Sequence, residues 1–172
     1  MTKEYNVFVN ASLIKRCVFF GHRKISNKKE VEYKLRLIIK ELIKEKNYKI
    51  FYFGGLGEFD LLCYNVVTEF KGEFPQIKRI FCVCDEKHLQ YSKRPKWLKE
   101  QEYEEFVYLP LRFDYWYTRI YYRNCEMINL SDFIVFYVDS ENDGGAHKTM
   151  KYANKRKKEY INIAKIKTTV VD

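Results

Sequence analysis

The stretch IFYFGGLGEFD, residues 50–60, joins a short run of strand-forming apolar residues to a glycine-rich turn and the start of a helical pattern. Residues 50–53 predict a buried strand that ends at Gly54 and Gly55, because paired glycines interrupt regular structure. Apolar residues at helical spacing follow, at Phe59, Leu62, Val66 and Phe70. A strand, a tight turn and a helix in this order are typical of one repeating unit of an α/β fold.

The same order recurs along the chain. We expect further strands at 17–20, 80–83, 106–108, 133–138 and 160–163, and further helices at 28–47 (capped by Ser26 or Asn27), 115–130 and 146–158. An irregular polar and aromatic stretch covers 85–105, and residues 7–9 are a candidate edge strand. Alternating strands and helices predict one α/β domain over 1–172, with its core at about 17–164. Its central sheet would be mostly parallel, with helices on both faces.

Composition narrows the classes of function. The chain has 172 residues, of which 47% are hydrophobic, enough for one well-buried core. None of its five cysteines forms a C-x₂-C pair, so we expect reduced core thiols, no metal site and no cofactor. We find no signal peptide, and no apolar run approaches the length of about 20 residues that is needed to span a bilayer. We therefore expect a cytoplasmic protein without a membrane partner.

The net charge of +9 indicates attraction to anions. The basic residues are spread along two expected helices, at 28–49 and 148–158, and no nucleic-acid-binding motif accompanies them. Nucleic acid is therefore not the favoured partner, although binding through these helices stays a third hypothesis.

Three glycine-bearing loops follow predicted strands. Glycines let the backbone turn sharply and let an anion approach free N–H groups at a helix start. Since parallel strands end at a shared edge of the sheet, we expect all three loops to line one cleft that binds phosphate. The predicted ligand-binding residues are Gly21, His22 and Arg23; Gly54, Gly55 and Gly57; and Gly144, Gly145, Lys148 and Thr149. An ordinary dinucleotide site is not expected, because Asp60 stands where its third glycine would be.

These loops carry a more specific resemblance. The runs CVFFGHR (17–23), FGGLGEFD (53–60) and GGAHKTMKYA (144–153) resemble signatures of the SLOG superfamily, and most of all a small bacterial branch of unknown function. The resemblance implies a Rossmann-like fold that binds a nucleotide or a ligand derived from NAD or ADP-ribose, as a sensing or sequestering module. The superfamily also includes the LOG (Lonely Guy) phosphoribohydrolases, which release bases from nucleoside monophosphates.

One arginine resembles the LOG catalytic arginine. Arg123 precedes Asp132 by nine residues, as in the LOG pattern, which implies a guanidinium at the ligand whose loss would leave folding nearly intact. However, Asn124 replaces the LOG lysine, and the glutamate expected after the glycine pair is absent. Hydrolysis would then lack its general base unless Glu58 or Asp60 substituted. Arg123, Glu58 and Asp60 are thus the catalytic candidates of the alternative hypothesis, a nucleoside 5′-monophosphate N-glycosidase.

Three further side-chain groups have alternative roles or a role outside the cleft. Arg123 could instead be a surface residue paired with Glu126. His22 and His147 could contact phosphate or simply hydrogen-bond the backbone. The aromatic residues around one expected helix are more than a single helix face can bury, which predicts a homo-oligomer. They are Phe113, Tyr115, Trp116, Tyr117, Tyr121 and Tyr122.

Overall fold

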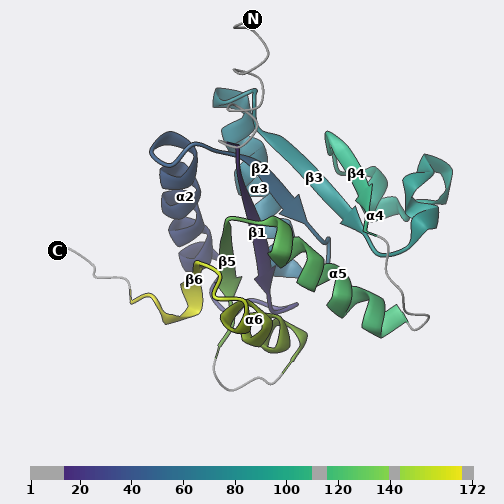
Figure 1. Cartoon of the computed structure of the whole chain (residues 1–172). Coiled ribbons are helices and arrows are strands. Elements are labelled where there is room, and N and C mark those ends of the chain that lie inside the picture. Colours follow the sequence, from purple (N-terminus) through teal and green to yellow (C-terminus); the bar gives the residue numbers. More distant parts are fainter. Residues whose placement is uncertain (1–13, 110–115, 140–143, 168–172) are drawn as a thin grey trace, which may run out of the picture.

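The computed structural model describes residues 14–109, 116–139 and 144–167, and these contain a parallel sheet of six strands (Figure 1). The strands are β1 (Lys15–Gly21), β2 (Tyr48–Phe53), β3 (Lys78–Val83), β4 (Glu105–Tyr108), β5 (Phe133–Tyr137) and β6 (Tyr160–Asn162). Their order is β4-β3-β2-β1-β5-β6, and every neighbouring pair is parallel. The predicted α/β fold is confirmed. The strand order reverses direction between β1 and β5, and parallel sheets commonly bind ligands at such a point. The candidate strand at 7–9 lies outside the described residues.

The long helices cover both faces of the sheet. α2 (Lys28–Lys44) and α3 (Glu58–Glu73) pack on one face, and α5 (Trp116–Leu130) and α6 (Gly145–Lys155) on the other (Figure 1). Each face has its own cluster of buried apolar side chains, with Phe19, Phe51 and Phe53 on the α2–α3 side and Val18, Ile134 and Phe136 on the α5–α6 side. Alternate residues of the central strands thus serve opposite faces, as the pleat requires.

Two predicted helices end earlier than the apolar pattern indicates. The helix expected at 28–47 stops at Lys44, and the one expected at 146–158 stops at Lys155. Asn47 and Lys157 adopt left-handed backbone angles, φ 60° and φ 53°, which an α-helix cannot continue through. At the start of α2 the predicted cap is confirmed, since the Asn27 side chain accepts a hydrogen bond from the amide of Glu30.

The irregular stretch between β3 and β4 is confirmed. It consists of three short turns of helix, η1 (Glu86–Leu89), η2 (Tyr91–Lys93) and α4 (Lys96–Lys99). Leu98 is fully buried beneath it and anchors it to the domain. The excursion therefore has a fixed place at the β4 edge of the sheet.

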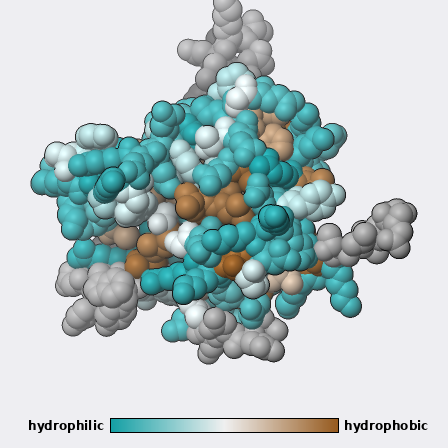
Figure 2. Space-filling model, turned by 180° about the vertical axis from the view of Figure 1, so that it is seen from behind, coloured by the Kyte–Doolittle hydropathy of each residue, from teal (hydrophilic) through white to brown (hydrophobic). Residues whose placement is uncertain are grey.

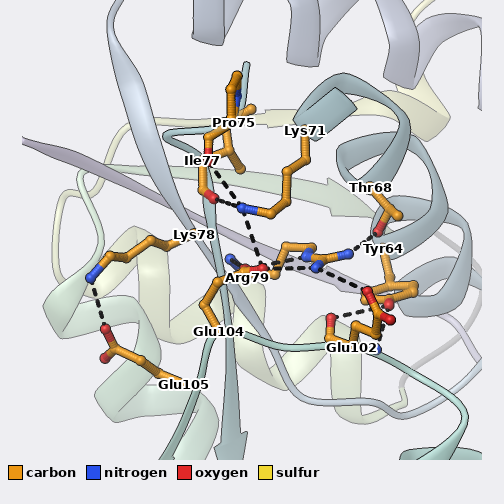
Figure 3. Close-up of polar contacts among 10 residues, drawn as sticks. All are labelled: Tyr64, Thr68, Lys71, Pro75, Ile77, Lys78, Arg79, Glu102, Glu104 and Glu105. Carbon is orange, nitrogen blue, oxygen red and sulfur yellow. Dashed lines mark hydrogen bonds and ion pairs between the residues drawn. The ribbon is translucent and has the colours of Figure 1, made fainter. Parts of the chain in front are cut away.

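A buried arginine joins the elements near the start of β3 (Figure 3). The Arg79 guanidinium donates to Glu104 (Nη2 to Oε1, 2.8 Å) and to the hydroxyl of Thr68 in α3 (3.1 Å). Lys71 adds an ion pair to the same Glu104 carboxylate, with Nζ and Oε1 3.3 Å apart. Because Arg79 lies in β3 and Glu104 directly precedes β4, this network ties both strands to α3.

The face covered by α2 and α3 has an apolar area near its centre, surrounded by hydrophilic side chains (Figure 2). The exposed large hydrophobic residues of these two helices are Tyr33, Leu37 and Leu61. Within the described ranges, no helix combines the length and apolar character needed to cross a membrane.

Candidate functional site

The cleft lies where the strand order reverses. It has a volume of about 900 Å³, and its walls come from the loops after β1, β2 and β5 and from α5 and α6. The predicted convergence of the three glycine-bearing loops is therefore confirmed. Of the predicted site residues, Gly21, His22, Arg23, Gly54, Asp60, Arg123, Gly144, Gly145 and Thr149 line the cleft, and Gly55, Gly57, Glu58 and Lys148 do not.

The loop after β2 is held by a carboxylate of its own. Asp60 accepts hydrogen bonds from the amides of Gly54 (3.2 Å) and Gly55 (2.9 Å). These two amides, which the sequence assigned to a phosphate, are thus already engaged within the protein. Burial raises the pKa of Asp60 to about 6, against the opposing effect of these bonds and of the nearby Arg123 charge.

Glycine is required in this loop for its backbone shape. Gly55 and Gly57 have φ of +71° and +98°, a region that L residues rarely adopt. A Cβ on Gly57 would also lie 2.6 Å from the Cα of Arg23, so the loops after β1 and β2 touch backbone to backbone. The two glycines set the shape of the cleft wall without lining it.

Glu58 binds these same two loops together. Its carboxylate accepts from the amide of Ile25 (2.9 Å) and from the Lys28 ammonium (2.9 Å), and its own amide donates to the Arg23 carbonyl (2.9 Å). The hydrogen bond from Lys28, together with that from Ile25, lowers the pKa of Glu58. This catalytic candidate is therefore a structural link outside the cleft wall.

Arg123 is buried, with only 2% of its surface exposed. The guanidinium Nη1 donates to the carbonyls of Gly54 (3.0 Å) and Cys82 (3.3 Å), and Nη2 donates to Oδ1 of Asn124 (3.0 Å). The alternative prediction, that Arg123 is a surface residue paired with Glu126, is wrong, because Arg123 is buried. Arg123 lines the cleft and also clamps the ends of β2 and β3, so we now expect its loss to destabilise the fold, in place of the expectation that folding would stay nearly intact.

The two histidines differ in position. Nε2 of His22 accepts from the amide of Asp139 (3.0 Å), and the His22 amide donates to the Tyr137 carbonyl (3.2 Å). His22 therefore ties the β1 loop to the end of β5. His147 does not line the cleft, and its Nδ1 is buried without a hydrogen-bond partner among the described residues.

The start of α6 is the open part of the cleft. Cβ atoms placed on Gly144 and Gly145 would meet no atom of the described residues within 4 Å. The amides of Gly145, Ala146 and His147 have no acceptor among the described residues, as expected for a first helical turn. Thr149, predicted to donate to the ligand, donates its hydroxyl proton to the Gly145 carbonyl instead (2.9 Å).

The cleft has an exposed arginine, Arg23, on its wall. The exposed guanidinium of Arg23 has no hydrogen bond or ion pair within the part of the chain that the structure describes. Across those same ranges, no group of three or more His, Cys, Asp or Glu side chains is placed to hold a metal ion.

Sequence reasoning missed Tyr137, whose position as the last residue of a buried strand places it at the cleft.

The parallel sheet, its reversal at β1 and the cleft at that point define a Rossmann-like α/β protein. No protein-family model matches the chain, and no curated protein matches its sequence. Among solved structures the chain is similar to DNA processing protein A from Helicobacter pylori, whose structure concerns its single-stranded DNA binding mode. The TM-score is 0.53 at 16% identity, over 85% of this chain and 63% of that one. At this identity the likeness shows the fold, and this chain spans less than two thirds of the other.

Proposed function

We propose that this protein binds a nucleotide or an NAD- or ADP-ribose-derived ligand in the cleft, with a phosphate at the start of α6. The observation that carries the proposal is the open first turn of α6, whose amides lack acceptors among the described residues. Such amides and the helix dipole favour an anion. The side chain of Arg23 lines the same cleft and supplies a full positive charge.

The remaining cleft walls support a ligand of nucleotide size. The volume of about 900 Å³ lies in the range typical of small-molecule sites. Asp60, Glu58 and His22 hold the loops after β1 and β2 by bonds to the backbone and join the β1 loop to the end of β5, which defines the shape of this wall. The resemblance of the three loops to SLOG signatures supports the same class of ligand and a sensing or sequestering role.

The test compares phosphate-bearing ligands with a phosphate-free one. We expect ADP-ribose, NAD or AMP to raise the melting temperature, and adenosine to have a much weaker effect. Arg23→Ala should weaken the best ligand roughly tenfold, on the scale of one charge-assisted hydrogen bond. Arg156→Ala, an exposed arginine at the far end of α6, is the matched control and should bind normally.

A second pair of variants tests the helix start directly. Gly145→Asp places a carboxylate in the first turn without a steric clash, because the site is open. It should abolish phosphate binding while leaving stability unchanged or slightly higher, since an acidic residue suits a helix start. Gly145→Ala adds the Cβ without the charge. Equal binding by both variants would contradict a phosphate at α6.

The N-glycosidase alternative rests on Asp60, a carboxylate of the cleft whose pKa is raised to about 6 by burial. Both of its oxygens accept backbone amides, which favours a structural role. Incubation with AMP or CMP separates the two hypotheses: release of free base that Asp60→Asn abolishes supports the enzyme, and binding without release supports the sensor.

A further inference from the structure

The excursion between β3 and β4 presents two aromatic side chains to solvent. Tyr91 is 64% exposed and Trp97 is 41% exposed. Trp97 is held in place by the domain beneath. The Trp97 ring lies edge-on to Phe81, with centroids 6.1 Å apart, and buried Leu98 fixes the neighbouring backbone. Large aromatic rings on a rigid exposed segment are available for stacking against a flat partner.

Two cations lie close to the Tyr91 ring. The Arg94 guanidinium lies 3.5 Å from the ring centroid of Phe106 and 5.7 Å from that of Tyr91, and the Lys99 ammonium lies 5.5 Å from the Tyr91 centroid. Arg94 is fixed by hydrogen bonds to the carbonyls of residues 88 and 89. These contacts bring basic and aromatic groups onto one small surface.

The positive charge of this surface is not neutralised locally. Lys93, Arg94 and Lys99 have no carboxylate partner in the described ranges, whereas Lys87 and Lys96 pair with Asp85 and Glu100. The charge therefore remains available to an anionic partner, in a protein of net charge +9.

We infer that this aromatic–basic surface, formed by Tyr91, Lys93, Arg94, Trp97 and Lys99, binds single-stranded nucleic acid. Unpaired bases can stack on the exposed rings, and the phosphates between them meet the unpaired cations. A duplex hides its base faces, so it would use the charges and leave the rings unused. The inference is independent of the cleft, because neither aromatic ring lines it.

The experiment measures binding of a fluorescein-labelled oligothymidylate of about 20 nucleotides by anisotropy, in about 50 mM salt and at rising salt. We expect Tyr91→Ala to weaken binding roughly tenfold, the scale of one base stacked on an aromatic ring. The matched control is Tyr33→Ala, a tyrosine of α2 that is 56% exposed. Lys93→Ala should weaken binding and reduce its salt dependence, and exposed Lys40→Ala on α2 should do neither.

Trp97 gives a second readout. The strand should quench tryptophan fluorescence in the unaltered protein and less so in Trp97→Leu. If Trp97→Leu fails to fold, Tyr91→Ala still decides, because its ring is mostly in solvent. Absence of binding by the unaltered protein would overturn the inference, as would equal losses in Tyr33→Ala and Tyr91→Ala. A loss in Arg23→Ala with none in Tyr91→Ala would place the strand in the cleft and also overturn it.

Discussion

Replacement of Arg123 by alanine should destabilise the whole domain. The variant leaves the carbonyls of Gly54 and Cys82 without the donor they share. It also removes the positive charge that favours the ionised form of the buried Asp60 carboxylate. Hydrogen bonds from a charged group contribute about 1.5–3 kcal/mol each, and a buried acceptor left unsatisfied is itself costly. We therefore expect the free energy of unfolding to fall by about 3–5 kcal/mol.

Urea unfolding followed by circular dichroism measures this change. The transition midpoint should fall with little change in slope, and the melting temperature should fall by about 10 °C for a domain of this size. Arg156→Ala is the control, because its side chain is exposed at the end of α6 and should change stability by less than about 0.5 kcal/mol. A loss below about 1 kcal/mol in Arg123→Ala would refute the clamp and return this arginine to a role in ligand binding alone.

Further outcomes follow from the backbone, from titration and from assembly. Gly57→Ala should destabilise the protein by at least about 1 kcal/mol in thermal unfolding because of its positive φ and its contact with the next loop, whereas Gly72→Ala in α3, with open space around it, should stabilise it by up to about 1 kcal/mol. Because burial raises the pKa of Asp60 above its ordinary value, its contribution to stability should fall as pH rises from about 4 to about 6, and Asp60→Asn should lack this fall in urea titrations. Burial acts to raise the pKa of Glu104, but its bonds with Arg79 lower it overall, so the stabilisation they give should be present above pH 4.5 and lost on further acidification; an acid-unfolding curve unchanged by Glu104→Gln would contradict this. Self-association remains a prediction, since the aromatic surplus lies partly outside the described residues, and a monomeric mass by light scattering would count against it.

The sheet and the cleft could be predicted because their signals are local. Apolar runs of three to six residues define the strands, glycines end the first two of them, and the carboxyl ends of parallel strands share one edge. The positions of Gly21, Gly54 and Gly145 at one cleft followed from that order alone.

The partners of polar side chains could not be predicted in the same way, because they depend on distant backbone atoms. The carbonyl of Gly54 that Arg123 contacts is 69 residues away, and the amide of Asp139 that His22 contacts is 117 residues away. A weak signal did exist for Arg123: Ile120 and Met127 stand at i−3 and i+4 to it, on the same helix face. That spacing places the arginine on the inward side of α5, where burial should have been expected.

The side-chain bonds between the cleft loops also determine how the protein would respond to a ligand. Glu58 links the loops after β1 and β2, and His22 links the β1 loop to the end of β5. Little conformational entropy would then be lost when a ligand arrives, because these backbones are already ordered. Association should be rapid, and amide hydrogen exchange should slow chiefly at the first turn of α6, with the linked loops nearly unchanged.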